Sequence, residues 1–143
     1  MQIDQPEIEQ QNRARKLDIV LKLIDARLRS RFDVLEAIAC PDVVVRIIGD
    51  KAVSRFAGTF KGKVAARSIL EALSIEFDYV KFETDYIMVD GDQVALRWHG
   101  DLRHRGTNAQ GQFEGFIHIV FRGELVAEYA AYIDMAALAK LSD

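Results

Sequence analysis

Cysteine is scarce in this sequence, because Cys40 is the only one among 143 residues. A single thiol excludes an internal disulfide framework, and its apolar setting (AIAC) predicts a buried core side chain. The chain nowhere holds the run of about 18 apolar residues that a transmembrane helix needs. The polar, acidic N-terminus (MQIDQPEIEQQN) is unlike a secretion signal. We therefore expect a cytoplasmic protein with no membrane partner.

An excess of charge of one sign is also missing, since the formal net charge is -3 and 29% of residues are charged. A slightly acidic chain has no general attraction for phosphates, so no nucleic-acid partner is expected. The three histidines show no metal-ligand spacing, and no glycine-rich phosphate loop is present, so neither a metal nor a cofactor is expected. With half its residues hydrophobic, the chain is predicted to be globular.

Hydrophobic periodicity predicts the order of helices and strands. Residues 1–12 are expected to be a flexible tail, and residues 13–143 a single domain. Apolar positions 17, 20, 21, 24 and 28 predict a helix over 13–30 with one buried face. Asp33, with Glu36 as its capping-box partner, begins a second helix that Pro41 stops. The remaining elements are a strand over 43–48, a helix over 63–77, strands over 79–89, 93–105, 113–122 and 125–134, and a short helix over 135–141.

The stretch DYIMVDGDQVALRWHGDLRHR contains the strongest local signal, an Asp90-Gly91 hairpin turn between two strands. If these two residues form the loop, Asp85 faces Leu96 and shares a face with Ile87. A carboxylate among apolar neighbours can act as an acid or base. A β-bulge would instead turn Asp85 to solvent.

The element order indicates an α+β fold: a cone-shaped, curved antiparallel sheet with three N-terminal-side helices packed on its concave face. Such a fold leaves a hollow between helices and sheet, which is a default ligand site. By alternation, Trp98 faces this hollow. His104 follows on the same alternation, where the alternative is an ordinary surface histidine.

A two-residue turn at Gly123-Glu124 would pair His118 with Tyr129, and the two side chains could then form an acid/base or oxyanion pair. The opposite parity would place Glu128, Tyr132 and Asp134 inside. A third alternative puts His118 and Tyr129 at a dimer contact, where tyrosine is enriched.

Three segments resemble the ketosteroid-isomerase-like branch of the nuclear transport factor 2-like superfamily, especially SnoaL-like polyketide cyclases. They are RFAGTFKGKVAARSIL before the third helix, IMVDGDQVALRW at the hairpin, and FRGELVAEYAAYIDMAALAKL at the end. The resemblance covers roughly residues 17 to 141. It implies a cone-shaped fold, a pocket between helices and sheet, and frequent dimers.

The resemblance also implies where the acid, base and oxyanion groups of ketosteroid isomerases would fall. The tyrosine position falls on Leu23, the base position on Ile47, and the third position on Ile117, or on His118 with a shift of one residue. Leucine and isoleucine cannot transfer protons, so steroid isomerisation is not expected. These apolar residues, together with Phe60, are expected to contact a ligand instead.

We therefore expect a cofactor-free isomerase, cyclase or dehydratase that acts by proton transfer on a small, largely apolar carbonyl compound. His118, Tyr129 and Asp85 are the candidate catalytic residues. Trp98, Leu23, Ile47, Phe60, Ile117 and His104 are the candidate ligand contacts. The alternative is a non-catalytic module that binds a hydrophobic ligand or dimerises. A homodimer through the outer sheet face is expected from Phe82, Tyr86 and Met88.

Overall fold

The structure is a computed structural model that describes residues 5–143. The helices are α1 (Gln5–Leu28), α2 (Phe32–Ala37), α3 (Lys63–Glu76) and α4 (Met135–Lys140). The strands are β1 (Ala39–Ile47), β2 (Gly58–Lys61), β3 (Phe77–Asp90), β4 (Gln93–His104), β5 (Gln110–Arg122) and β6 (Leu125–Ile133). This is the expected mixed α+β architecture.

The six strands form one curved sheet in the order β2-β1-β6-β5-β4-β3. Neighbouring strands are antiparallel except β1 and β6, which run parallel. The sequence analysis expected an antiparallel sheet throughout. The parallel pair is possible because β2, α3 and β3–β5 separate β1 from β6 in the chain, so no tight turn joins the two strands.

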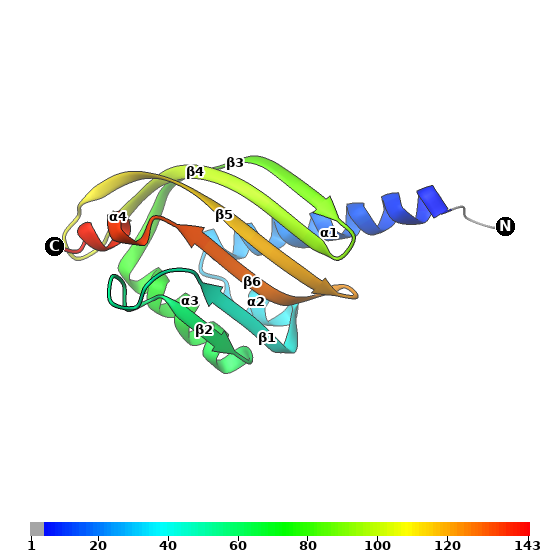
Figure 1. The fold of residues 1–143 in the computed structure, drawn as a ribbon, viewed down its shortest axis with the longest axis horizontal. Coiled ribbons are helices and arrows are strands. Elements are labelled where there is room, and N and C mark those ends of the chain that lie inside the picture. The colour runs from blue at the N-terminus through cyan, green and yellow to red at the C-terminus, as the bar shows by residue number, and fades with distance from the viewer. Residues whose placement is uncertain (1–4) are drawn as a thin grey trace.

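Helices α1, α2 and α3 lie on one face of the sheet, as Figure 1 shows. Alternate residues of the strands meet these helices, for example Val94, Leu96 and Ile119, which are all fully buried. The core continues into α1 through Val20 and into α3 through Leu70. None of the helices within residues 5–143 combines the length and hydrophobicity needed to cross a membrane.

Helix α1 begins at Gln5, earlier than the expected start at residue 13. Residues 1–4 of the expected tail lie outside the described residues. The buried stripe of α1 is also rotated from the expected one: Val20, Leu23 and Ala26 are buried, whereas Leu21 is 57% exposed. Leucine spacing alone could not choose between these neighbouring faces.

Helix α2 does not begin with the predicted capping box. Its N-cap is Arg31, which makes no side-chain cap hydrogen bond. The carboxylates of Asp33 and Glu36 instead accept hydrogen bonds from Arg67 Nη1 of α3, at 3.0 Å and 3.1 Å. Pro41 does not stop the helix either, because α2 ends at Ala37 and Pro41 lies within β1. Cys40, beside it, is buried as predicted.

The β3–β4 hairpin has a different register from the one expected. Asp90 pairs with Gln93, so Gly91 and Asp92 form the turn. A bulge then interrupts the pairing between Thr84 and Tyr86. The bulge turns Asp85 to the outer face of the sheet, the alternative stated above, and the predicted pairing of Asp85 with Leu96 is wrong.

The β5–β6 hairpin carries a bulge next to its turn, between Val120 and Phe121. Beyond the bulge, Tyr129 pairs with Ile119, and His118 pairs with Ala130. The predicted pairing of His118 with Tyr129 is therefore wrong. Since successive side chains point to opposite faces, His118 and Tyr129 lie on opposite sides of the sheet.

Candidate functional site

A cavity of about 330 Å³ lies between the helices and the inner face of the sheet. Its walls are mainly apolar and aromatic side chains from α3, α4 and every strand except β2; they include Ile47, Leu73, Phe77, Trp98, Leu102, Ile117, Ile133, Met135 and Leu138. Exposed residues Ser30 and Arg105 line one end, so the cavity opens to solvent there. Size and lining suit a small, mostly apolar ligand.

Arg27 of α1 brings a positive charge into this cavity. Its Nη1 donates to Ser74 Oγ at 3.4 Å, and its Nε is buried without a hydrogen-bond partner. Burial works against the charge, but Tyr79 and Tyr129 outweigh it, so the pKa of Arg27 lies above its ordinary value. Arg27 makes no ion pair with any carboxylate among the described residues. It is a guanidinium available to an oxyanion.

Tyr79 and Tyr129 reach Arg27 from two different strands, β3 and β6. The ring of Tyr79 packs edge-on against Phe82 at 5.5 Å and against Trp98 at 5.8 Å between centroids. This packing fixes the phenol beside the guanidinium. Burial raises the pKa of Tyr79, which therefore stays protonated and can donate a hydrogen bond at neutral pH.

Asp78 is the only carboxylate among the described residues that line the cavity. Arg103 Nη2 donates to its Oδ2 at 2.5 Å, and Arg105 forms an ion pair with its Oδ1. Arg105 Nε also donates to the Ser74 carbonyl oxygen at 3.1 Å. The carboxylate of Asp78 is thus held between the guanidiniums of Arg103 and Arg105 at the open end of the cavity.

Four of the residues predicted to form the site line this cavity. They are Ile47 of β1, Trp98 of β4, Ile117 of β5 and Tyr129 of β6. Their side chains share the inner face because each strand alternates in register with its neighbour. Of the two residues considered for the third position, Ile117 lies on the inner face and lines the cavity, and His118 does not.

Leu23 and Phe60 do not line the central cavity. Leu23 lines a smaller apolar space of about 50 Å³ between α1, α2, α3 and β1, on the other side of Arg27. Phe60 lies on the edge strand β2 and packs half-buried against the core. Leu23 and Phe60 were expected to contact a ligand in the central cavity. Both instead pack elsewhere against the core.

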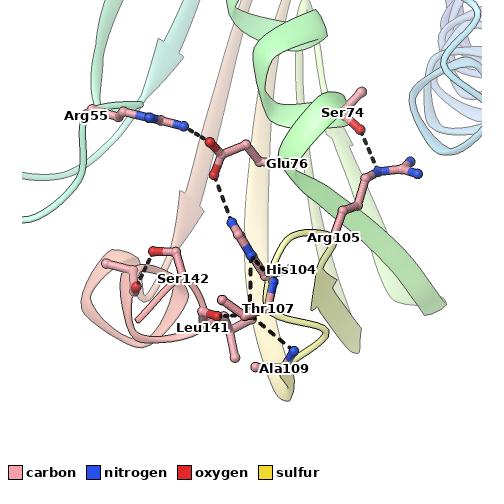
Figure 2. A network of polar contacts seen from close by, with 10 residues as sticks. Arg55, Ser74, Glu76, His104, Arg105, Thr107, Ala109, Leu141 and Ser142 are labelled. Atoms are coloured by element: carbon pink, nitrogen blue, oxygen red, sulfur yellow. Dashed lines mark hydrogen bonds and ion pairs between the residues drawn. The ribbon is translucent and has the colours of Figure 1, made fainter.

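His104 also lies away from the cavity, and it is not the surface histidine considered above. It is 9% exposed, and its ring meets Phe77 edge-on at 5.3 Å. Figure 2 shows its hydrogen bonds: Nε2 to Glu76 Oε2 at 3.1 Å, and Nδ1 accepting from the Thr107 backbone N–H at 3.0 Å. Glu76 in turn pairs with Arg55. His104 joins the end of α3 to the β4–β5 turn.

His118 and Asp85 face the outer side of the sheet. His118 Nε2 lies 2.9 Å from Gln93 Oε1, and Asp85 Oδ1 lies 2.6 Å from His99 Nδ1. Neither residue lines the cavity, so they cannot act there with Tyr129. The two bulges described above are the physical reason.

Sequence reasoning missed Arg27, Tyr79 and Asp78. Arg27 had a signal, because it lies four residues after Leu23 and seven after Val20, on the buried stripe of α1. A charge on such a stripe is uncommon and points to a site. Tyr79 follows Phe77 at the strand period of two, but its inward orientation depended on the register of β3.

The SnoaL-like domain model matches residues 20–129. The chain belongs to the SnoaL-like domain family. The matched segment extends from α1 into β6 and includes Arg27, Asp78, Tyr79 and Tyr129. A search of curated proteins found no match to this SnoaL-like chain.

Solved structures share the fold of this SnoaL-like domain. An NTF2-like protein from Burkholderia xenovorans LB400 is 24% identical, with a TM-score of 0.79, covering 91% of this chain and 97% of its own. A proposed SnoaL-like polyketide cyclase from Jannaschia sp. CCS1 is 13% identical, with a TM-score of 0.76 and coverage of 90% and 91%. TerC, co-crystallized with polyporic acid, is 12% identical, with a TM-score of 0.73 and coverage of 89% and 97%.

Proposed function

We propose that this SnoaL-like domain is a cofactor-free isomerase or cyclase that acts by proton transfer on a small, largely apolar carbonyl compound. One observation carries the proposal: the guanidinium of Arg27 and the hydroxyls of Tyr79 and Tyr129 meet at the wall of an otherwise apolar cavity. Hydrogen-bond donors fixed in a desolvated site stabilise the negative oxygen that forms when a carbonyl compound enolises.

The chemistry begins with removal of a proton from the carbon next to the substrate carbonyl. The electron pair of that C–H bond moves to the carbonyl oxygen, which becomes an enolate oxygen held by Arg27 and Tyr79. In an isomerisation the proton returns to another carbon. In a cyclisation the enolate carbon attacks a second carbonyl carbon, and the new alkoxide takes a proton. Asp78, as the carboxylate of the lining, is the candidate base.

Steroid isomerisation is not part of this proposal. The three positions that carry its acid, base and oxyanion groups correspond here to Leu23, Ile47 and Ile117. Ile47 and Ile117 line the cavity wall, and Leu23 lies behind Arg27. The cavity therefore holds its donors at other positions, on α1, β3 and β6.

Two of the similar solved structures support a small carbonyl compound as the substrate class. One is a proposed polyketide cyclase, and another was co-crystallized with polyporic acid. Because their sequences are only 13% and 12% identical to this chain, what they share with it is the fold. Polyporic acid nevertheless offers a first ligand for soaking and calorimetry.

The test is hydrogen–deuterium exchange at the α-carbon of small cyclic ketones and diketones, followed by NMR. The wild-type protein should accelerate exchange over buffer, and Arg27→Met should remove most of that acceleration. Tyr79→Phe should reduce it by about 100- to 1000-fold, as for loss of one oxyanion donor. Tyr86→Phe, on the outer face, is the control and should leave exchange unchanged. The proposal fails if no ketone exchanges faster than in buffer.

A second candidate function is ligand binding without turnover. It is favoured by the pairing of the lining carboxylate: both oxygens of Asp78 are already engaged by Arg103 and Arg105. In that case hydrophobic ligands bind in the cavity, and the exchange assay stays at the buffer rate.

We also propose that the protein is a homodimer through the outer face of the sheet. Tyr86, Arg97, Phe116 and Tyr132 form one cross-strand row over β3, β4, β5 and β6. The three aromatic residues are each 42–45% exposed. Phe82, named for this face from the sequence, instead points inward and stacks on Trp98 at 5.0 Å. The β3 bulge separates it from Tyr86 and Met88.

A further inference from the structure

Two buried side-chain nitrogens lack a hydrogen-bond partner within the part of the chain that the structure describes, residues 5–143. They are Nε of Arg27 and Nε of Arg103. Buried polar atoms are nearly always paired, and an unpaired donor on a charged group is especially costly. Both arginines line the same central cavity. The cavity lining therefore contains two guanidiniums whose hydrogen-bonding capacity the described residues do not fully use.

The charges around the cavity have one dominant sign. Of the described residues that line it, three carry guanidiniums (Arg27, Arg103 and Arg105) and one carries a carboxylate (Asp78). The lining thus has two positive charges in excess, in a chain whose formal net charge is -3. A cleft lined by one sign of charge raises the local concentration of ligands of the opposite sign.

The three arginines differ in their partners. Arg103 and Arg105 both bind the carboxylate of Asp78. Arg27 instead contacts Ser74 and the side chains of Tyr79 and Tyr129. Asp78 therefore balances the charge of Arg103 and Arg105 in part, while Arg27 keeps an uncompensated charge beside apolar walls. A buried uncompensated charge is costly unless a counter-ion joins it.

We infer that the natural ligand of this cavity is an ionised oxygen acid: a small apolar or aromatic body carrying a carboxylate or an ionised enol that binds Arg27. This inference rests on the proposed function to the extent that both place the substrate in the central cavity. It narrows the substrate from a neutral carbonyl compound to an anion. Planar O–C–O groups also match the fork of a guanidinium.

An anionic ligand explains why few side chains in the cavity lining can act as a general base. A ligand that enters as an ionised enol already has its enolate electron pair, so the protein does not have to remove that proton. It needs cations to hold the anion and a proton donor for the product. Arg27 and the protonated Tyr79 supply these two functions.

The test compares matched acids and neutral analogues on the wild-type protein by calorimetry at neutral pH. Cinnamate with cinnamamide tests the carboxylate, and lawsone with its methyl ether tests the ionised enol. Because charge-assisted hydrogen bonds discriminate strongly, at least one acid should bind about 10- to 100-fold more tightly than its neutral partner. Equal affinity within both pairs, or no binding of either acid at millimolar concentration, overturns the inference.

Variants then assign the preference to the cavity. Arg27→Met should reduce the affinity for the preferred acid by about 10-fold or more and leave the neutral analogue little changed. Arg122→Met is the matched control, because Arg122 is a surface arginine paired with Asp42. It should bind as the wild type does. Arg27→Lys, which keeps the charge, should retain part of the preference. If Arg27→Met binds the acid as tightly as the wild type, the assignment to Arg27 is wrong.

The outcomes separate this inference from the proposed function. Acid preference without any acceleration of α-carbon exchange supports an anion-binding cavity and contradicts the isomerase or cyclase. Accelerated exchange of neutral ketones without acid preference supports the enzyme and contradicts the anionic ligand. The wild-type comparison does not depend on any variant folding.

Discussion

Trp98 lies between two aromatic neighbours of β3: its indole stacks on Phe82 at 5.0 Å and meets Tyr79 edge-on at 5.8 Å between ring centroids. On its other side lies Gly115 of β5, its cross-strand neighbour. A Cβ at position 115 would come within 2.8 Å of the indole and 2.7 Å of the Tyr132 carbonyl oxygen. The absence of a side chain at Gly115 thus allows Trp98 to hold Tyr79 in place.

Gly115→Ala should therefore destabilise the protein and disturb the site together. Overpacking of this kind costs about 1–3 kcal/mol in the free energy of unfolding, measured by urea denaturation. The displaced indole should also shift the tryptophan emission, since Trp98 is the only tryptophan. Glu114→Ala, at the exposed neighbouring position, is the control and should leave the emission unchanged. Unaltered emission and stability in Gly115→Ala would contradict this account of the packing.

Tyr79 should make the stability of the protein fall at high pH. Burial raises its pKa above the ordinary value of 10.0, so the unfolded chain releases this proton at a lower pH than the folded chain does. The stabilising effect is complete below about pH 10 and is lost as pH rises towards the folded-state pKa. The slope reaches about 1.4 kcal/mol per pH unit between the two pKa values.

The measurement is the urea concentration at the midpoint of unfolding, taken between about pH 8 and 11. This range spans the ordinary tyrosine pKa of ~10. Tyr79→Phe should flatten the alkaline loss of stability relative to the wild type, because phenylalanine has no proton to release. Tyr86→Phe, on the exposed outer face, should follow the wild-type curve. Parallel curves for all three proteins would show that Tyr79 ionises alike in both states.

Phe116 should contribute to the proposed dimer, since it lies in the middle of the aromatic row on the outer sheet face. Phe116→Lys places a charge in that interface and should shift the protein to a monomer in light scattering at micromolar concentration. Val64→Lys changes a residue of α3 that is 84% exposed and should leave the dimer intact. A wild-type monomer at this concentration would exclude the outer-face dimer.

His104 should hold the C-terminal turn through Thr107. Thr107 Oγ1 lies 3.3 Å from His104 Nδ1 and donates to the Leu141 carbonyl oxygen at 2.5 Å (Figure 2). His104→Ala should cost about 1–3 kcal/mol in the free energy of unfolding, because it removes a buried ring together with its hydrogen bonds to Glu76 and Thr107. The amides of α4 should also exchange faster with deuterium.

Ser142→Ala provides the control for that experiment. It removes an exposed hydrogen bond to the Ala139 carbonyl oxygen within the same turn and should have little effect on exchange in α4. Faster exchange confined to the β4–β5 turn in His104→Ala, with α4 unchanged, would contradict the proposed link to Leu141.

Most of the element order and the fold class could be predicted from the amino-acid pattern. The strands over 79–89 and 93–105 and the helix over 63–77 were predicted within two residues of β3, β4 and α3. These elements are long and strongly patterned, and the turns at Gly91 and Gly123 have positive φ, which glycine favours. Trp98 followed from alternation alone, because no bulge interrupts the pairing of β4 with β5.

The tertiary structure decided which polar side chains share the cavity. Bulges in the β3–β4 and β5–β6 pairings turned Asp85 and His118 outward and kept Tyr79 and Tyr129 inside. A shift of one residue reverses every side chain beyond it, and hydrophobic patterning does not locate such a shift when both faces carry apolar residues. Arg27 became part of the site only when α1 packed against the sheet, because the leucine spacing of α1 fits two neighbouring helix faces equally well.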